Sequence, residues 1–190
     1  SLHKLDLAGL LSVVPYTPDI TGVLDGDFHA IISGKDMSIS SDIRLQNLCY
    51  EGCLMGNISS EIVYMPQADG SHHVDGILYK DEKEVASIVG TYYFRDEDYI
   101  DAEISLDDLP MNLVNGFVPD QIVGMDGYGN GTLSIKGKVS EPVVDGTIDL
   151  SKAAFVSVPY GVTMTIDEDP VKIVGSNVLF DNFSFYDKNK

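Results

Sequence analysis

The sequence predicts a mainly β protein built on an antiparallel sheet, with one or two short helices. Short runs rich in Val, Ile, Tyr and Phe alternate apolar and polar residues with a period of two, which is typical of strands with one apolar and one wet face. The chain has 18 Gly, and many stand between these runs, where turns require them. With 44% hydrophobic and 22% charged residues, the composition is that of a folded domain.

The first part of the chain is expected to begin with a helix and to continue in strands. Residues 5–14 carry apolar side chains at helical spacing, and Pro15 and Pro18 follow them. A short helix is therefore expected over 5–14. Over residues 22–64 the period changes to two, which predicts strands.

Two polar turns divide the middle of the chain. Residues 67–71 and the charged run 80–83 each separate two strand-like segments. The segment 85–94 has apolar residues on both of its faces, which predicts a central strand that is covered from both sides.

A second helix is expected over 109–117. Asp107 and Asp108 precede Pro110, and acidic residues with an early proline favour the first turn of a helix. The side chains that this helix would bury are Leu109, Leu113, Val114 and Phe117.

Beyond residue 117 the alternation of apolar and polar residues is regular, which predicts strands with one apolar face. This face is the candidate binding surface of the protein. The residues expected to line it are Leu133, Ile135, Ile148, Leu150, Val162, Met164 and Ile166.

The chain contains an internal repeat with an offset of 105 residues (127 − 22). Residues 22–28 (GVLDGDF) align with 127–133 (GYGNGTL), and 42–45 (DIRL) align with 147–150 (TIDL). A short apolar helical segment precedes each copy. We therefore expect a first β unit over 1–106 and a second over 107–190, within one continuous module that is a fragment of a longer protein. Repeats of this kind bury their apolar face by stacking on neighbouring repeats of the same chain, and they form elongated surfaces.

The charge of the chain excludes some partners. The 12 Lys and Arg stand against 30 Asp and Glu, so the net charge is −18. Such a surface repels phosphate backbones, and no nucleic acid is expected as a partner.

The two cysteines, Cys49 and Cys53, are expected to be free thiols. In one extended strand their Cα atoms would lie about 13 Å apart, too far for a disulfide. They can bond only if residues 50–52 form a tight turn.

No pattern of catalytic or metal-binding residues stands out, so we expect neither an enzyme nor a cofactor. His72 and His73 are neighbours on a strand and point to opposite faces, which prevents joint chelation. Asp25 and Asp27, with Asp101 or Glu103, are the available carboxylate pairs for glycoside hydrolysis. With 30 acidic residues such pairs arise by chance, and Asp25 and Asp27 suit a turn.

Two segments resemble the C-terminal region of the TamB and AsmA-like envelope proteins. Residues 127–137 (GYGNGTLSIKG) and 142–150 (PVVDGTIDL) follow that family's pattern of alternating glycines and apolar residues, a short spacer with Pro, and an alternating strand. The resemblance is clearest over 109–187 and weaker over 5–106. It departs over 124–131, where more glycines occur than the pattern requires.

The resemblance implies a β-taco, an antiparallel sheet curved into a trough with an apolar interior. An open sandwich is the alternative arrangement expected for the sheet. It also implies a protein of the Gram-negative periplasm that is anchored in the inner membrane through a segment outside this sequence. Its partners would be phospholipid acyl chains and an Omp85-type outer-membrane protein.

Two functions therefore remain open. One is a non-catalytic periplasmic bridge with an apolar groove, for phospholipid transport between membranes or for outer-membrane protein assembly. The alternative is an extracellular β-sandwich that binds carbohydrate or a protein partner. The chain has no Trp for stacking on sugars, although its ten Tyr can substitute in part.

Overall fold

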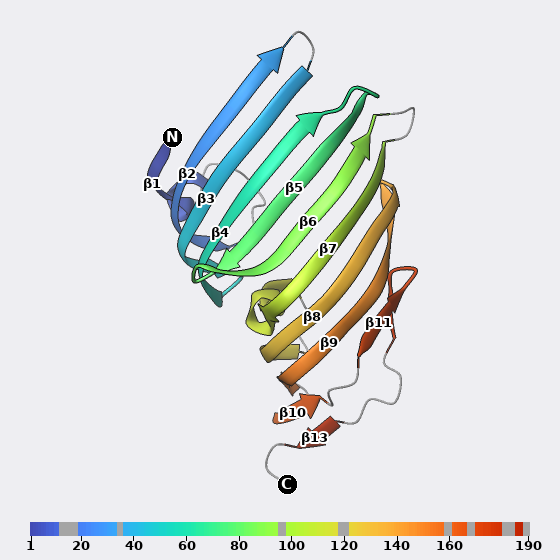
Figure 1. The fold of residues 1–190 in the computed structure, drawn as a ribbon. Coiled ribbons are helices and arrows are strands. Elements are labelled where there is room, and N and C mark those ends of the chain that lie inside the picture. Colours follow the sequence, from blue (N-terminus) through green and yellow to red (C-terminus); the bar gives the residue numbers. More distant parts are fainter. Residues whose placement is uncertain are drawn as a thin grey trace.

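The computed structural model describes residues 1–11, 19–33, 36–94, 98–117, 122–157, 161–166, 170–179 and 185–187. These residues form one antiparallel sheet of 13 strands that does not close on itself, together with two short helices (Figure 1). The predicted fold class is confirmed. In this part of the chain there is one sheet and no second one to pack against it, as a sandwich would require.

The strands follow one another across the sheet in chain order as far as β10. The first six are β1 (Leu2–Asp6), β2 (Ile20–Ser33), β3 (Asp36–Tyr50), β4 (Cys53–Pro66), β5 (Ser71–Lys80) and β6 (Lys83–Tyr93). The next four are β7 (Tyr99–Pro110), β8 (Ile122–Lys138), β9 (Glu141–Ser157) and β10 (Val162–Ile166). The short strands β11 (Val171–Val174), β12 (Asn177–Leu179) and β13 (Phe185–Asp187) complete the sheet, and the helices are α1 (Leu7–Leu11) and the 3₁₀ helix η1 (Met111–Phe117).

Cross-strand register places the apolar residues of successive strands on one face. Ile62 of β4 lies opposite Gly76, which lies opposite Ile88 of β6. Ile88 lies opposite Ile104 of β7, and Ile104 lies opposite Leu133 of β8. Because residues directly opposite each other share a face, these residues form one row across five strands, in which Gly76 is the member without a side chain.

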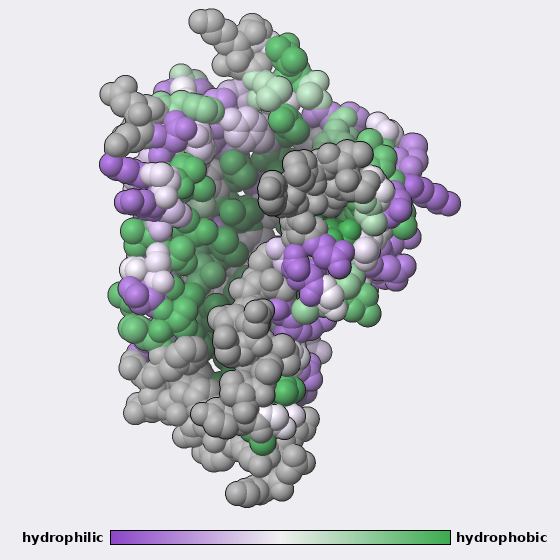
Figure 2. Space-filling model, turned by 180° about the vertical axis from the view of Figure 1, so that it is seen from behind, coloured by the Kyte–Doolittle hydropathy of each residue, from purple (hydrophilic) through white to green (hydrophobic). Residues whose placement is uncertain are grey.

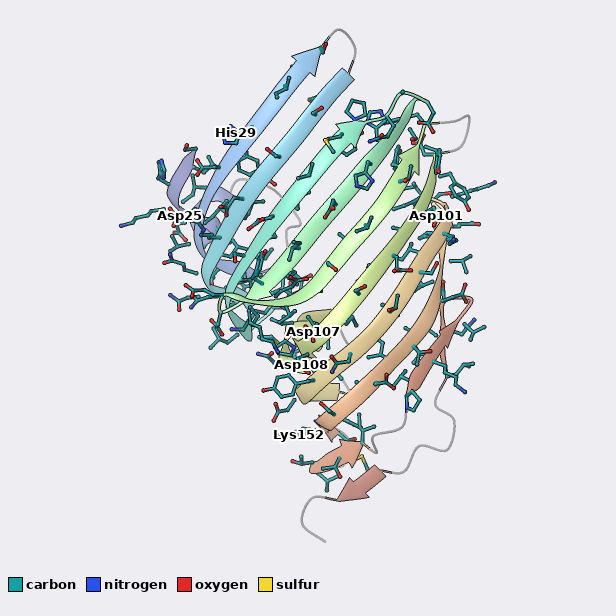
Figure 3. The ribbon with its side chains drawn as sticks, viewed as in Figure 1. Asp25, His29, Asp101, Asp107, Asp108 and Lys152 are labelled. Atoms are coloured by element: carbon teal, nitrogen blue, oxygen red, sulfur yellow. The ribbon has the colours of Figure 1, made fainter. Side chains whose placement is uncertain are left out.

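The other face carries most of the charge. Asp101 of β7 lies opposite Lys136 of β8, and their charged groups are 3.2 Å apart. Asp25 and His29 lie on β2 on the same outer face (Figure 3). The expected division into a wet and an apolar face is thus confirmed.

The apolar face is the hollow side of the curved sheet. Seen from behind, hydrophobic residues line a recess that runs over the sheet (Figure 2). A compact monomer of 20.7 kDa exposes about 8,900 Å² of surface. This chain exposes 11892 Å², and only nine hydrophobic residues of its described part are buried. On the inner face Phe28, Ile32 and Ile62 are 46%, 73% and 39% exposed, so part of this face is open.

The sequence repeat is reproduced in the backbone. Hairpin β2–β3 and hairpin β8–β9 share the same register at an offset of 105, so that Leu24 opposite Leu45 corresponds to Gly129 opposite Leu150. Both copies lie in one sheet, and the expected boundary at 106/107 falls inside β7.

The two copies also share a bulge near the start of their first strand. Gly22 and Gly127 both have positive φ, and each approaches the backbone of the partner strand closely. The partner strands carry Asn47 and Lys152 with φ of 52° and 51°, again 105 residues apart. Lys152 lies at the lower end of β9 (Figure 3).

A polar side chain fixes the strand that precedes each hairpin. The Lys4 amide donates to Asp25 Oδ1 over 2.9 Å, and the Asp108 amide donates to Asn130 Oδ1 over 2.8 Å. Asp25 and Asn130 are equivalent in the repeat, and both donors have φ near 50°. The repeat therefore includes hydrogen bonds that the sequence alignment does not reveal.

Both expected helices differ from the prediction. Leu5 lies in β1 opposite Leu24, so the first helix is shorter, and the rest of its expected range lies outside the described residues. The expected short helix over 109–117 forms as the 3₁₀ helix η1 and begins at Met111, two residues later than predicted, because β7 continues through Pro110. Asp108 adopts φ 49° in a bulge, and its carboxylate accepts from Lys83 Nζ over 2.9 Å. Asp108, which had indicated a helix start, therefore lies in a bulge of β7 and binds Lys83. Of the side chains expected to be buried there, Leu113 is buried.

The expectation that 85–94 is covered on both sides is also wrong. The segment forms β6, which lies well inside the sheet, but Val89 on the outer face is 50% exposed. Ser87 and Thr91 flank Val89 on that face, and no second layer covers it in the described part. The apolar residues on both faces here reflect the strand preference of Val and Ile.

The two cysteines are free. A tight turn does form at residues 51–52, but Cys49 lies opposite Leu54 whereas Cys53 lies opposite Tyr50. The two thiols therefore point to opposite faces of the hairpin, which prevents a disulfide.

We expect Gly127→Ala to destabilise the protein strongly. Its φ is 97°, and an added Cβ would lie 2.7 Å from backbone atoms of residues 151–153. Gly52→Ala is the matched control, because φ there is 75° but no atom lies within 4 Å. Urea denaturation should show a loss of about 3 kcal/mol for Gly127→Ala and about 1 kcal/mol for Gly52→Ala. Equal losses would contradict the close packing of this bulge.

Candidate apolar groove

The middle of the inner face holds an open, apolar groove. A cavity of about 390 Å³ lies over β4 to β7. It is lined mainly by the aliphatic side chains of Ile62, Leu78, Ile88 and Ile104. A second cavity of about 180 Å³ shares Ile88 with the first and extends the groove toward the start of β7.

Gly76, Gly90 and Ala102 are small residues on the inner face, where neighbouring strands leave little space for side chains. An added Cβ at Gly90 would lie 2.6 Å from the Cβ of Ala102 on the neighbouring strand. An added Cβ at Gly76 would lie 3.1 Å from Ile88 Cγ2. Larger side chains would collide on the hollow side, so these positions allow the curvature and leave room for Ile88.

One end of the groove carries an aromatic cluster with polar atoms. The rings of Tyr64 and His72 stack with their centroids 4.9 Å apart. Phe94 meets His72 edge-on at 4.7 Å and Tyr92 at 4.7 Å. This group of four, which we call the aromatic end, borders the smaller cavity.

The polar atoms of the aromatic end are only partly satisfied. His72 Nδ1 is buried and has no hydrogen-bond partner in the described part of the protein. A hydrogen bond to Asp98 raises the pKa of Tyr92, and burial raises the pKa of Tyr64. Both hydroxyls therefore stay protonated at neutral pH, and His72 offers an unused donor or acceptor.

The other end of the groove is partly closed by η1. This helix contacts both β8 and β4, which lie four strands apart, so it reaches over the hollow side of the sheet. From Ile100 to Pro110, β7 advances by ten residue steps, or about 33 Å, between the aromatic end and η1. The groove thus has one aromatic, partly polar end and one end bordered by a helix.

The seven candidate residues lie in two groups. Leu133, Ile135, Ile148 and Leu150 face the hollow side on β8 and β9, where Leu133 lies opposite Gly146 and Ile148 opposite Gly131. Leu150 is buried together with Ala153 and Val171, and Ile148, Ile166 and Met111 pack against this cluster. Val162 and Met164 lie on β10 and are half-buried.

The structure separates the other residues considered from the sequence. His72 faces the groove, whereas His73 faces outward. Asp25 and Asp27 lie on β2, and Asp101 and Glu103 lie on β7, five strands or about 24 Å away along the sheet. Within the described ranges, no three His, Cys, Asp or Glu residues come together to hold a metal ion.

The residues that line the two apolar cavities were not among the sequence candidates. Ile88, Ile104 and the aromatic end lie in the middle of the sheet, whereas all seven candidates lie after residue 132. The alternation of β4 to β7 was visible in the sequence. Pairing of Tyr64 with His72 and Phe94 depends on cross-strand register, which alternation alone does not give.

Comparison of the chain with family models, with curated proteins and with solved structures returns no match. Neither helix in the described part is long and apolar enough to cross a membrane. The class of protein is therefore defined by its fold: a curved, unclosed antiparallel sheet with an apolar inner face.

We expect His72→Phe to stabilise the protein by about 1 kcal/mol, because it removes a buried polar atom without a partner and keeps the aromatic packing. His73→Phe, on the outer face, should change the free energy of unfolding by less than about 0.5 kcal/mol. Thermal or urea unfolding of the two variants checks this. A loss of stability in His72→Phe would show that Nδ1 is satisfied in solution.

Proposed function

We propose that this chain is a non-catalytic segment that binds the acyl chains of phospholipid in its apolar groove. The observation that carries the proposal is the row of residues from Ile62 to Leu133, aliphatic on every strand but β5, on an inner face that is partly open. Ile88 and Ile104 are only half-buried although they lie in the centre of the sheet. Monomeric proteins rarely leave an apolar surface of this extent open unless something binds there.

The dimensions and energetics of the groove suit an acyl chain. The hydrocarbon core of a bilayer is about 30 Å thick, so one acyl chain extends about 15 Å. The groove is about twice that length. Each buried methylene contributes about 0.8 kcal/mol, so ten of them contribute about 8 kcal/mol before the cost of ordering the lipid.

The two ends of the groove would orient such a ligand. A polar head group at the aromatic end can lie against Tyr64 and Tyr92, which line the smaller cavity, and the acyl chain can then run toward η1. The tyrosine rings suit a boundary between water and apolar surroundings. The acidic outer face stays in water and keeps the sheet away from anionic bilayer surfaces.

This binding mode agrees with a TamB or AsmA-like role. We infer a periplasmic bridge segment of a Gram-negative bacterium, held by an inner-membrane anchor outside this sequence. It would serve phospholipid transport between membranes or outer-membrane protein assembly, with an Omp85-type partner. The support is the resemblance over 109–187 together with the trough-shaped sheet.

Lipid extraction followed by mass spectrometry tests the proposal. After expression in a Gram-negative host, the purified chain should carry phospholipid. Ile104→Asp places a charge in the groove and should reduce the bound lipid about tenfold, because a carboxylate is costly to bury. The neighbouring change Ser105→Asp points outward and should leave it unaltered.

Circular dichroism of both variants controls for folding. The proposal fails if the wild-type chain neither retains phospholipid nor binds a fluorescent phospholipid added to it. It fails equally if Ile104→Asp and Ser105→Asp lose lipid to the same extent. Saturable binding on a glycan array, lost on Tyr64→Phe, would instead support a carbohydrate-binding role.

A further inference from the structure

The upper part of β2 is an open edge of the sheet. Strand β1 pairs with β2 only over residues 23–26. Among the described residues, no strand pairs with 27–33 on that side. Ile31 and Ile32 of this segment are 71% and 73% exposed, and Phe28 is 46% exposed. Long apolar edges of this kind pair with other strands unless they are protected.

The internal repeat shows what fits this edge. The equivalent of 27–33 in the second copy is 132–138 of β8, and that segment is paired along its whole length with residues 99–105 of β7. Ile104, Ala102 and Ile100 lie on the inner face of that pair, opposite Leu133, Ile135 and Gly137. The corresponding positions on β2 are Phe28, Ala30 and Ile32.

We propose that the 27–33 edge of β2 binds an extended segment of another protein as an added antiparallel strand. The bound segment carries the alternation of β7, with apolar residues facing the hollow side and acidic or hydroxyl residues facing outward. This is β-strand addition, in which main-chain hydrogen bonds give affinity and alternate side chains give specificity.

The occupant is not a second copy of this chain. A second copy could offer its own β2 edge, which lacks Asp101 and Glu103, the outward acidic residues of β7, but not β7 itself, because that strand is already paired on both sides, with β6 and β8. The net charge of −18 on each copy also opposes self-association. The edge is far from the groove's centre at β4 to β7, so the proposal does not depend on lipid binding.

Register-specific cross-linking tests the proposal. Ile31 is equivalent to Lys136 in the repeat, and Lys136 lies opposite Asp101. Residue 101 of a bound β7-like segment should therefore lie opposite Ile31. The probe is a synthetic peptide of residues 99–106 that carries Asp101→Cys. The protein carries Ile31→Cys or, as control, Ile32→Cys, in a background with Cys49→Ser and Cys53→Ser.

Ile31 and Ile32 are almost equally exposed but point to opposite faces. Under oxidising conditions, Ile31→Cys should form the mixed disulfide about fivefold faster or more than Ile32→Cys, because only directly opposite side chains reach bonding distance. A peptide with the same residues in scrambled order should show no such preference. Equal rates, or no cross-link to either variant, would overturn the proposal. The proposal would also be overturned if sedimentation showed a dimer in which a disulfide joins the Ile31→Cys residues of two copies.

Discussion

The arrangement of this molecule depends on strand register. Apolar residues occupy alternate positions, so a shift of one residue in any strand pair would move that strand's apolar side chains to the outer face. The registers hold the row from Ile62 to Leu133 across β4 to β8. Where the alternation is interrupted, as at Asn47 and Lys152, a bulge absorbs the extra residue at the end of the strand. The inner face, the curvature and the groove all follow from this constraint.

Much of the fold could be predicted because alternation is a local property. Ile135 and Lys136 already indicate opposite faces in the sequence, and the structure places them so. The expected helix at 109–117 begins only at Met111, because Asp107 and Asp108 favour both a helix start and a turn. The choice was decided by contacts distant in sequence, from Lys83 and Asn130. Local pattern cannot supply such contacts.

The candidate site, too, was predictable only where it depends on local alternation. Sequence reasoning found the right face at Leu133 to Leu150 but not the aromatic end, since His72 meets Tyr64 and Phe94 only after β4, β5 and β6 are paired. The neighbouring His73 has the same residue type and no such role. Its position one residue further along places it on the outer face. Residue type alone therefore could not separate the two histidines.

The two short helices set a spacing along the sheet. Helix α1 contacts β2 and η1 contacts β8, and these strands are equivalent members of the repeat. Six strand intervals of about 4.8 Å separate β2 from β8 by about 29 Å along the curved sheet. That spacing is close to the thickness of the hydrocarbon core of a bilayer. The length of the repeat in residues therefore sets the distance between equivalent positions of the inner face.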